Sequence, residues 1–201
     1  MSLFSSDFRK NKASIARHKR RFSNSLWHVD WHRLKEPRWG GHWLLAYEDD
    51  ASRFITGFAV SDCLTAELHA QVLQGSVKRY GRPVTLVASY DSTFCSVESM
   101  KRDGGITELE KFILKNKIRL VLSVVRRRAS GKIDKFFSLL ESVANYFSSM
   151  EEFATWYNCV RPHGGIGLRT PLQAYYQRLP QADMIAFPSF MENEPSGKLF
   201  L

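Results

Sequence analysis

The order of the apolar segments constrains the fold of this chain more than any other feature of its sequence. Three runs rich in apolar and aromatic residues come first, at 25–32, 42–48 and 53–61, and Asp-Asp-Ala-Ser joins the last two with a composition typical of a hairpin turn. Helical and strand patterns then alternate, in the order helix 65–81, strand 83–89, helix 106–116, strand 118–125 and a long amphipathic helix from 131 onward. This order predicts an α/β fold in which helices cover both faces of a mixed five-stranded sheet.

The ends of the first helix are marked by two residues. Thr65 precedes the helical pattern and is expected to cap it, and Gly81 follows the pattern and is expected to stop it. The last helix is predicted to be long, because apolar residues recur at helical intervals from Ile133 to Phe147.

The first strand contains the sequence Trp-His-Val-Asp-Trp-His, which places a carboxylate in the middle of an apolar run. Side chains alternate along a strand, so one face carries Trp27, Val29 and Trp31, and the other carries His28, Asp30 and His32. The tryptophan face is expected to be core. Burying Asp30 is costly unless a cation such as Arg or a metal ion compensates its charge.

Two further aspartates are placed where they can join Asp30. Asp91 follows the strand at 83–89, near the end at which sites in α/β sheets open, and Asp134 lies in the first turn of the long helix. Three such carboxylates suit Mg²⁺ or Mn²⁺, and two ions about 4 Å apart can support phosphoryl transfer. A second interpretation of Asp134 stays open, since a carboxylate also complements a helix N-terminus. Asp49 and Asp50 are interpreted as turn residues.

The basic charge of the chain indicates a polyanionic partner. The net charge is +9 and the pI about 9.6. Residues 1–22 hold seven basic residues and one acidic residue, a net +6, and are predicted to form an arm that is either solvated or bound along DNA phosphates. The residues predicted to contact DNA are Arg17, Lys19, Arg20, Arg21, Arg126, Arg127, Arg128, Lys132 and Lys135.

The cysteine and hydropathy patterns exclude several classes of protein. Cys63, Cys95 and Cys159 are too few and too widely spaced for a disulfide framework or a zinc site, so a reducing compartment is expected. No apolar run approaches the roughly 20 residues that span a bilayer, and the N-terminus lacks the apolar stretch of a signal peptide. We therefore expect a cytoplasmic protein without a membrane partner.

Five stretches of the sequence together resemble the transposases of insertion sequences, whose catalytic core is of the retroviral-integrase type. In chain order they are SNSLWHVDWH, WLLAYEDDASRFITGFAV, YGRPVTL, SGKIDKFF and TWYNCVRPHGGIGLRTPLQAYY, across residues 23–178. We expect 1–22 to be an arm, 23–178 the core and 179–201 a tail. The family usually begins with helix-turn-helix modules, and only the basic arm precedes Asp30 here.

The resemblance implies an RNase H-like fold and a function in DNA transposition. A triad of two aspartates and a glutamate would bind two Mg²⁺ or Mn²⁺ ions, and it maps here onto Asp30, Asp91 and Asp134. The implied reaction is cleavage of phosphodiesters at transposon ends followed by strand transfer from a DNA 3′-hydroxyl. The implied partners are transposon-end and target DNA and further copies of the chain. His28 and His32 are expected beside the metal site and not as ligands, because Mg²⁺ prefers oxygen.

Several assignments have alternatives. An ungapped alignment anchored on Thr85 and Phe94 puts Ser89 at the second acid position, and a two-residue shift puts Asp91 there. The third acid is Asp134 where the family has Glu; Glu141 follows two turns later on the same side of the helix, which is too far to replace it. The chain is accordingly an active strand transferase, a nuclease that uses the same carboxylates, or a DNA-binding remnant without catalysis.

The segment 161–171 also has two interpretations. Its glycines after an aromatic helix are typical of a helix stop followed by a packed loop. The alternative is a contact with DNA through Arg161, His163 and Arg169.

Overall fold

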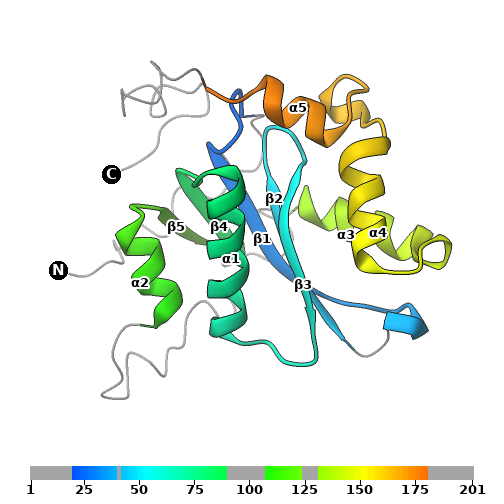
Figure 1. Cartoon of the computed structure of the whole chain (residues 1–201), viewed down its shortest axis with the longest axis horizontal. Coiled ribbons are helices and arrows are strands. Elements are labelled where there is room, and N and C mark those ends of the chain that lie inside the picture. The colour runs from blue at the N-terminus through cyan, green and yellow to red at the C-terminus, as the bar shows by residue number, and fades with distance from the viewer. Residues whose placement is uncertain (1–19, 40–41, 90–106, 124–130, 181–201) are drawn as a thin grey trace.

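A five-stranded sheet forms the centre of the computed structural model, which describes residues 20–39, 42–89, 107–123 and 131–180 (Figure 1). The strands are β1 (Leu26–Arg33), β2 (Trp43–Asp49), β3 (Ile55–Ser61), β4 (Thr85–Ser89) and β5 (Arg119–Ser123). Their order is β3-β2-β1-β4-β5, with β1 antiparallel to β2 and parallel to β4. The predicted mixed five-stranded α/β fold is confirmed, and β1 is its central strand.

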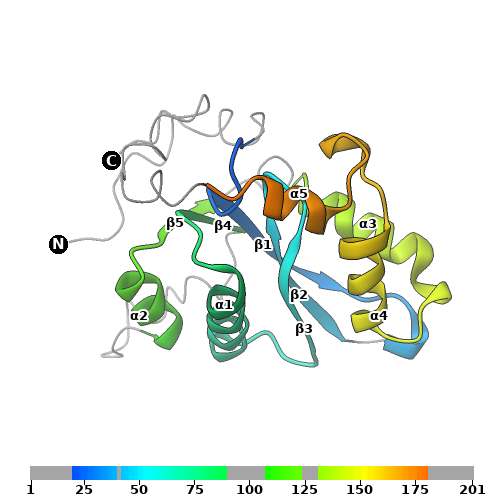
Figure 2. The same cartoon turned by 45° about the horizontal axis from the view of Figure 1, so that its top comes forward.

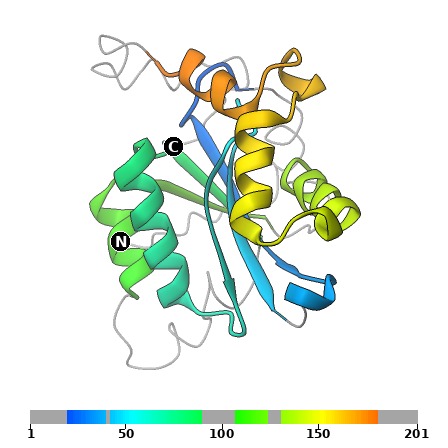
Figure 3. The ribbon, with the colours of Figure 1, turned by 45° about the vertical axis from the view of Figure 1, so that its right-hand side comes forward.

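Helices cover both faces of this sheet. Figure 3 shows α1 (Ala66–Tyr80) and α2 (Glu108–Lys115) on one side, and α3 (Ile133–Val143) and α4 (Met150–Thr155) on the other. The last described helix, α5 (Pro171–Gln177), lies across one end of the sheet (Figure 2). Short turns complete the described chain: η1 (Pro37–Trp39), η2 (Ala144–Tyr146), the π-helical turn η3 (Trp156–Val160) and η4 (Gly164–Ile166).

The predicted ends of α1 are confirmed, whereas the predicted length of α3 is wrong. The Thr65 hydroxyl accepts a hydrogen bond from the backbone N–H of Leu68, and Gly81 ends the helix at a φ of 83°. The expected single helix through Phe147 instead ends at Val143, followed by η2. Phe147 has an extended backbone and packs on Phe153, with ring centroids 5.4 Å apart. Its apolar contact therefore comes from a turn of the chain and not from a continued helical stripe.

Each face of the sheet has its own apolar core. Facing α1 and α2, Trp27 and Val29 are buried with Leu45 and Leu86, and Trp31 packs against them while partly buried. The prediction that the tryptophan face is core is confirmed. On the opposite face the core is built from α3, α4 and β2, and its members include Leu44, Ala46, Phe136, Phe137, Leu140, Phe153 and Tyr157.

The expected ends of the core segment are joined. The backbone N–H of Ser23 donates to the carbonyl oxygen of Arg178 at 2.8 Å, and the Ser23 hydroxyl donates to the carbonyl oxygen of Tyr175 at 2.8 Å. The division into arm, core and tail stays a prediction, because most of the arm and the tail lies outside the described residues. None of the helices in the described ranges has the length and apolar content that a lipid bilayer requires.

Candidate active site

Asp30 lies near the middle of β1, on the face that α3 covers. Its side chain is half-buried, and Oδ1 accepts a hydrogen bond of 2.9 Å from the backbone N–H of Trp31. On one side of β1, Asp30 is paired with Ala46 of β2. On the other side, Ala88 of β4 is paired with Val29, so Ser89 is the next residue along β4, beside Asp30.

The second acid position is therefore not decided by the described residues. The backbone register places Ser89 next to Asp30, as the ungapped alignment predicts. Asp91, the predicted catalytic and metal-binding residue, lies outside the described residues, as do Arg126, Arg127 and Arg128.

The N-terminal end of α3 is held by an ion pair. Nζ of Lys132 lies 2.7 Å from both carboxylate oxygens of Asp50, which is buried in the turn after β2. The same carboxylate is 2.7 Å from Nε2 of His28 on β1. Lys132 was predicted to contact DNA, and the structure adds this second contact; a phosphate contact by Lys132 stays a prediction.

The C-terminal half of α3 is held by a second pair. Oε1 of Glu141 lies 2.7 Å from Nε2 of His32, whose ring stacks on Phe137 at a centroid distance of 4.8 Å. Both histidines of β1 thus bind carboxylates through Nε2. That they are neighbours of a metal site and not ligands stays a prediction.

These two pairs set α3 alongside β1 in a fixed register. The four residue steps from His28 to His32 span about 13 Å of strand, and the nine steps from Lys132 to Glu141 span about 13.5 Å of helix. Asp30 lies about 6.6 Å beyond His28, and Asp134 lies about 3 Å beyond Lys132. Asp30 thus lies between His28 and His32, and Asp134 lies between Lys132 and Glu141, on two elements that run in the same direction.

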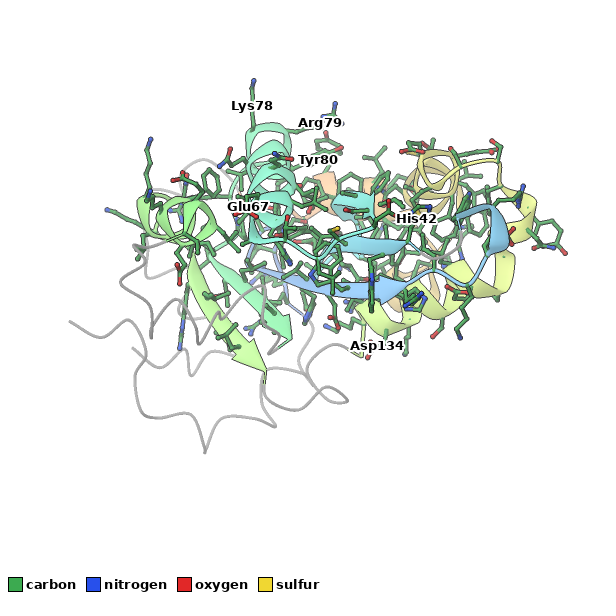
Figure 4. The ribbon with its side chains drawn as sticks, turned by 90° about the horizontal axis from the view of Figure 1, so that it is seen from below. His42, Glu67, Lys78, Arg79, Tyr80 and Asp134 are labelled. Carbon is green, nitrogen blue, oxygen red and sulfur yellow. The ribbon has the colours of Figure 1, made fainter. Side chains whose placement is uncertain are left out.

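Asp134 is on the same side of the sheet as Asp30. Figure 4 shows it on the α3 side, away from α1. Its side chain is partly exposed, and its carbonyl oxygen accepts a hydrogen bond of 2.8 Å from the Ser138 hydroxyl inside the helix. The structure thus brings two of the three predicted acids to one face.

A buried acidic cluster lies beside this face. Burial raises the pKa of Glu48 to about 8, although Arg53 acts in the opposite direction. Burial likewise raises the pKa of Asp49 to about 6, against hydrogen bonds from Ser52 and Asn24. Burial acts the same way on Asp50, but the hydrogen bond and charge of His28 and the charge of Lys132 hold its pKa below the ordinary value.

The predicted turn role of Asp49 is visible in its hydrogen bonds. Its carboxylate accepts from the Ser52 hydroxyl at 2.6 Å and from the backbone N–H of Asn24 at 2.8 Å. Sequence reasoning missed the second role of Asp50, which also fixes α3. Asp50 and Lys132 are 82 positions apart in the sequence, and no local pattern links them.

The other predicted DNA-binding residues have different surroundings. Arg20 is buried, with 6% of its surface exposed, and Arg21 is exposed with its guanidinium 5.0 Å from the ring centroid of Phe22. Lys135 is exposed on α3. Arg17 and Lys19 lie outside the described residues. Their contacts with DNA stay predictions.

The described acids fit an oxygen-liganded divalent ion only in part. Asp30 and Asp134 supply the hard donors that Mg²⁺ prefers, from a strand and a helix on one face. Within the described ranges, no group of three or more His, Cys, Asp or Glu side chains is placed to hold a metal ion. A complete site would need the second acid that was predicted at Asp91.

Solved structures with a similar fold are retroviral integrases. A chain of the simian T-cell lymphotropic virus intasome in complex with PP2A regulatory subunit B56 gamma superposes with a TM-score of 0.65 at 18% identity, over 82% of this chain and 59% of that chain. The HTLV-2 integrase catalytic core domain in complex with magnesium, in its dimeric form, gives 0.58 at 13% identity, over 77% of this chain and 97% of that chain. The BIV integrase catalytic core domain gives 0.57 at 15% identity, over 77% and 95%.

These similarities show the fold, which is that of RNase H-like integrase cores. The chain spans about three fifths of the length of the intasome chain and nearly all of the isolated core domains. No protein-family profile matches the sequence, and no curated protein sequence matches it.

Proposed function

We propose that this chain is the catalytic core of an enzyme of DNA transposition or integration, of the insertion-sequence type. It would cleave phosphodiesters at transposon ends and join them to target DNA, using Asp30, Asp91 and Asp134. One observation carries the proposal: Asp30 on the central strand and Asp134 on α3 share one face of an integrase-like fold, and ion pairs fix α3 along β1. The assignment to insertion sequences rests on the sequence resemblance alone.

The residues of the chain have separate roles in this proposal. The carboxylates of Asp30, Asp91 and Asp134 would hold Mg²⁺ or Mn²⁺, which would supply activation of an attacking oxygen and stabilisation of charge on a phosphoryl group. Lys132 and Glu141 hold α3, which carries Asp134, alongside β1, which carries Asp30. Preorganisation of this kind matters because metal ligands that shift by about 1 Å lose much of their effect.

DNA and further copies of the chain are the proposed partners. The net charge of +9 suits a polyanion. One similar structure is an intasome, and the HTLV-2 core is known in dimeric and trimeric forms. We extend both properties to this chain as part of the proposal.

A second candidate function is a DNA-binding remnant without catalysis. The observation that favours it is the register of β4, which places Ser89 beside Asp30 where a second acid would be close to the first. Serine cannot replace a carboxylate as a charged metal ligand. The two candidates differ in whether Asp91 reaches the site from beyond the end of β4.

Cleavage of a labelled DNA duplex by the full chain in Mn²⁺ distinguishes the candidates. We expect Asp30→Asn and Asp134→Asn to lower cleavage by about 100-fold or more, since even groups that only orient metal ligands contribute about 10- to 100-fold. Asp62→Asn is the matched control, because Asp62 is an exposed aspartate with 78% of its side chain accessible. Duplex binding in EDTA should be retained in all three variants.

Two outcomes would reject the catalytic proposal. Wild type and Asp30→Asn could give the same products, which would make the activity a contaminant. Wild type could also bind DNA without cleaving it, and cleavage by Ser89→Asp would then identify the chain as a remnant that lacks the second acid.

A further inference from the structure

The segment from His163 to Arg169, here called the 163–169 loop, is closed at its base and anchored to the core. The backbone N–H of His163 donates to the carbonyl oxygen of Arg169 at 2.9 Å, and that of Leu168 donates to the carbonyl oxygen of His163 at 3.1 Å. Nδ1 of His163 accepts from the backbone N–H of Gly165 at 3.1 Å, and Ile166 is buried. The loop therefore has a fixed shape.

Leu168, next to the closing residue Arg169, has an unfavourable backbone and an unfavourable environment. Its φ is 59°, a left-handed conformation in which the Cβ of an L-residue crowds the backbone. Glycine and asparagine adopt it easily, whereas leucine rarely does. The side chain is 75% exposed, so burial does not offset the strain. Strain that the fold does not use for packing is found most often at functional sites.

Arginines lie on the same segment as this exposed leucine and next to it in the chain. A Cβ placed on Gly167 would lie 3.7 Å from Nη1 of Arg169, so this guanidinium lies beside Gly167. Arg161 precedes the loop, with its guanidinium carbon 6.0 Å from the ring centroid of Tyr157. Burial lowers the pKa of Arg178, and the charge of nearby Arg169 lowers it further. The segment thus combines one exposed apolar side chain with arginines.

We propose that the 163–169 loop contacts duplex DNA, with Leu168 inserted at a base step while Arg161 and Arg169 bind the flanking phosphates. The proposal rests on the proposed function in taking DNA as the partner. Leucine is one of the side chains that proteins insert between bases, where it partly unstacks them and kinks the duplex. Arginines beside it bind phosphates and release counterions. The hydrogen bond from the backbone N–H of Leu168 to His163 fixes the backbone that carries this exposed leucine side chain.

Substitution of Leu168 distinguishes a role in DNA binding from a role in stability, because the melting temperature and the duplex affinity are expected to change in opposite directions. Leu168→Asn accepts the left-handed backbone and should raise the melting temperature by about 2–4 °C. The same variant should bind a duplex about tenfold more weakly, since it loses the inserted group. A duplex that carries 2-aminopurine reports unstacking by a rise in fluorescence, which Leu168→Asn should abolish. All measurements use the full chain in EDTA, so they do not depend on catalysis.

Two control variants bracket the result. Leu168→Met keeps an apolar side chain of similar size and should retain both duplex affinity and the fluorescence change. Val160→Ala removes another exposed apolar group, one that is 61% accessible just before the loop, and should change neither.

Three results would overturn the proposal. Leu168→Asn could bind the duplex as tightly as wild type. Wild type could bind without any change in fluorescence. The variant could also weaken self-association in sedimentation while DNA binding stays intact, which would assign the loop to contact with a second copy. Loss of cleavage in Asp30→Asn bears only on the catalytic proposal, so the two can fail separately.

Discussion

The two faces of the sheet use the same strands for different purposes. Toward α1 and α2, strands β1 and β2 present Trp27, Val29 and Leu45, all buried in an apolar core. Toward α3 and α4, the alternate residues of the same strands include His28, Asp30, His32 and Glu48. Both faces thus have an apolar core, and the two-residue period of β1 places its ionisable side chains on the α3 face.

The two faces also differ in how they compensate the ionisable groups that they bury. His69 is an ionisable group on the α1 side; it contacts the hydroxyl of Tyr47 at 3.0 Å, and burial lowers its pKa to about 3. On the α3 side, Asp50 is ionised and paired, whereas Glu48 is buried with neither carboxylate oxygen hydrogen-bonded to the described residues. The first face gains stability from contact area, and the second uses ion pairs to fix the position of α3.

The largest expected effect comes from adjacent leucines of β2 that point to opposite faces. Leu44 and Leu45 are both fully buried, and each lies in a different core. Truncation to alanine should lower the free energy of unfolding by about 2–5 kcal/mol at either position, measured in urea. Only Leu44→Ala loosens the packing under α3, so only this variant should also lose cleavage per folded molecule. Equal losses of cleavage would show that the faces are not separate.

A smaller effect is expected from the ion pair at the start of α3. Lys132→Met leaves the buried carboxylate of Asp50 without its lysine and should cost about 3 kcal/mol in urea denaturation. Lys135→Met, at an exposed position on the same helix, should cost about 0.5 kcal/mol or less. Similar losses of unfolding free energy in the two variants would mean that the ion pair stabilises the fold no more than an exposed lysine does.

The sequence was sufficient for the features that follow from local periodicity. Alternation along the first strand predicted which face Trp27 and Asp30 occupy, and capping chemistry predicted Thr65 and Gly81 as the ends of α1. It could not predict that α3 stops at Val143, because the apolar spacing to Phe147 continues across a turn.

Long-range pairing was also beyond local patterns. The contact of Lys132 with Asp50 depends on the packing of α3 against the β2–β3 hairpin. In the sequence, a lysine beside a basic run is equally consistent with a contact to DNA. The second acid position depends on strand register, where a shift of two residues exchanges Ser89 for Asp91.

The smallest expected effect, per pH unit, comes from Glu48. Its pKa in the folded chain is about 8, against an ordinary value of 4.5. Between pH 6 and 8 the unfolded chain has lost this proton while the folded chain keeps it, so stability falls as the pH rises, by up to about 1.4 kcal/mol per pH unit. Glu48→Gln has no proton to lose, and urea denaturation across this window should show a flatter decline.

The opposite face supplies the control for this measurement. Because the pKa of His69 is lowered to about 3, the unfolded chain binds a proton that the folded chain refuses as the pH falls below 6.5, and stability falls with it. Below pH 4.5 Glu48 carries its proton in the unfolded chain as well as in the folded chain, so the remaining loss down to pH 3 should be the same in wild type and Glu48→Gln. If the variant instead declined as steeply as wild type between pH 6 and 8, Glu48 would be ionised in the folded chain. Arg53 would then compensate its charge, and every buried carboxylate on the α3 side would be paired as Asp50 is.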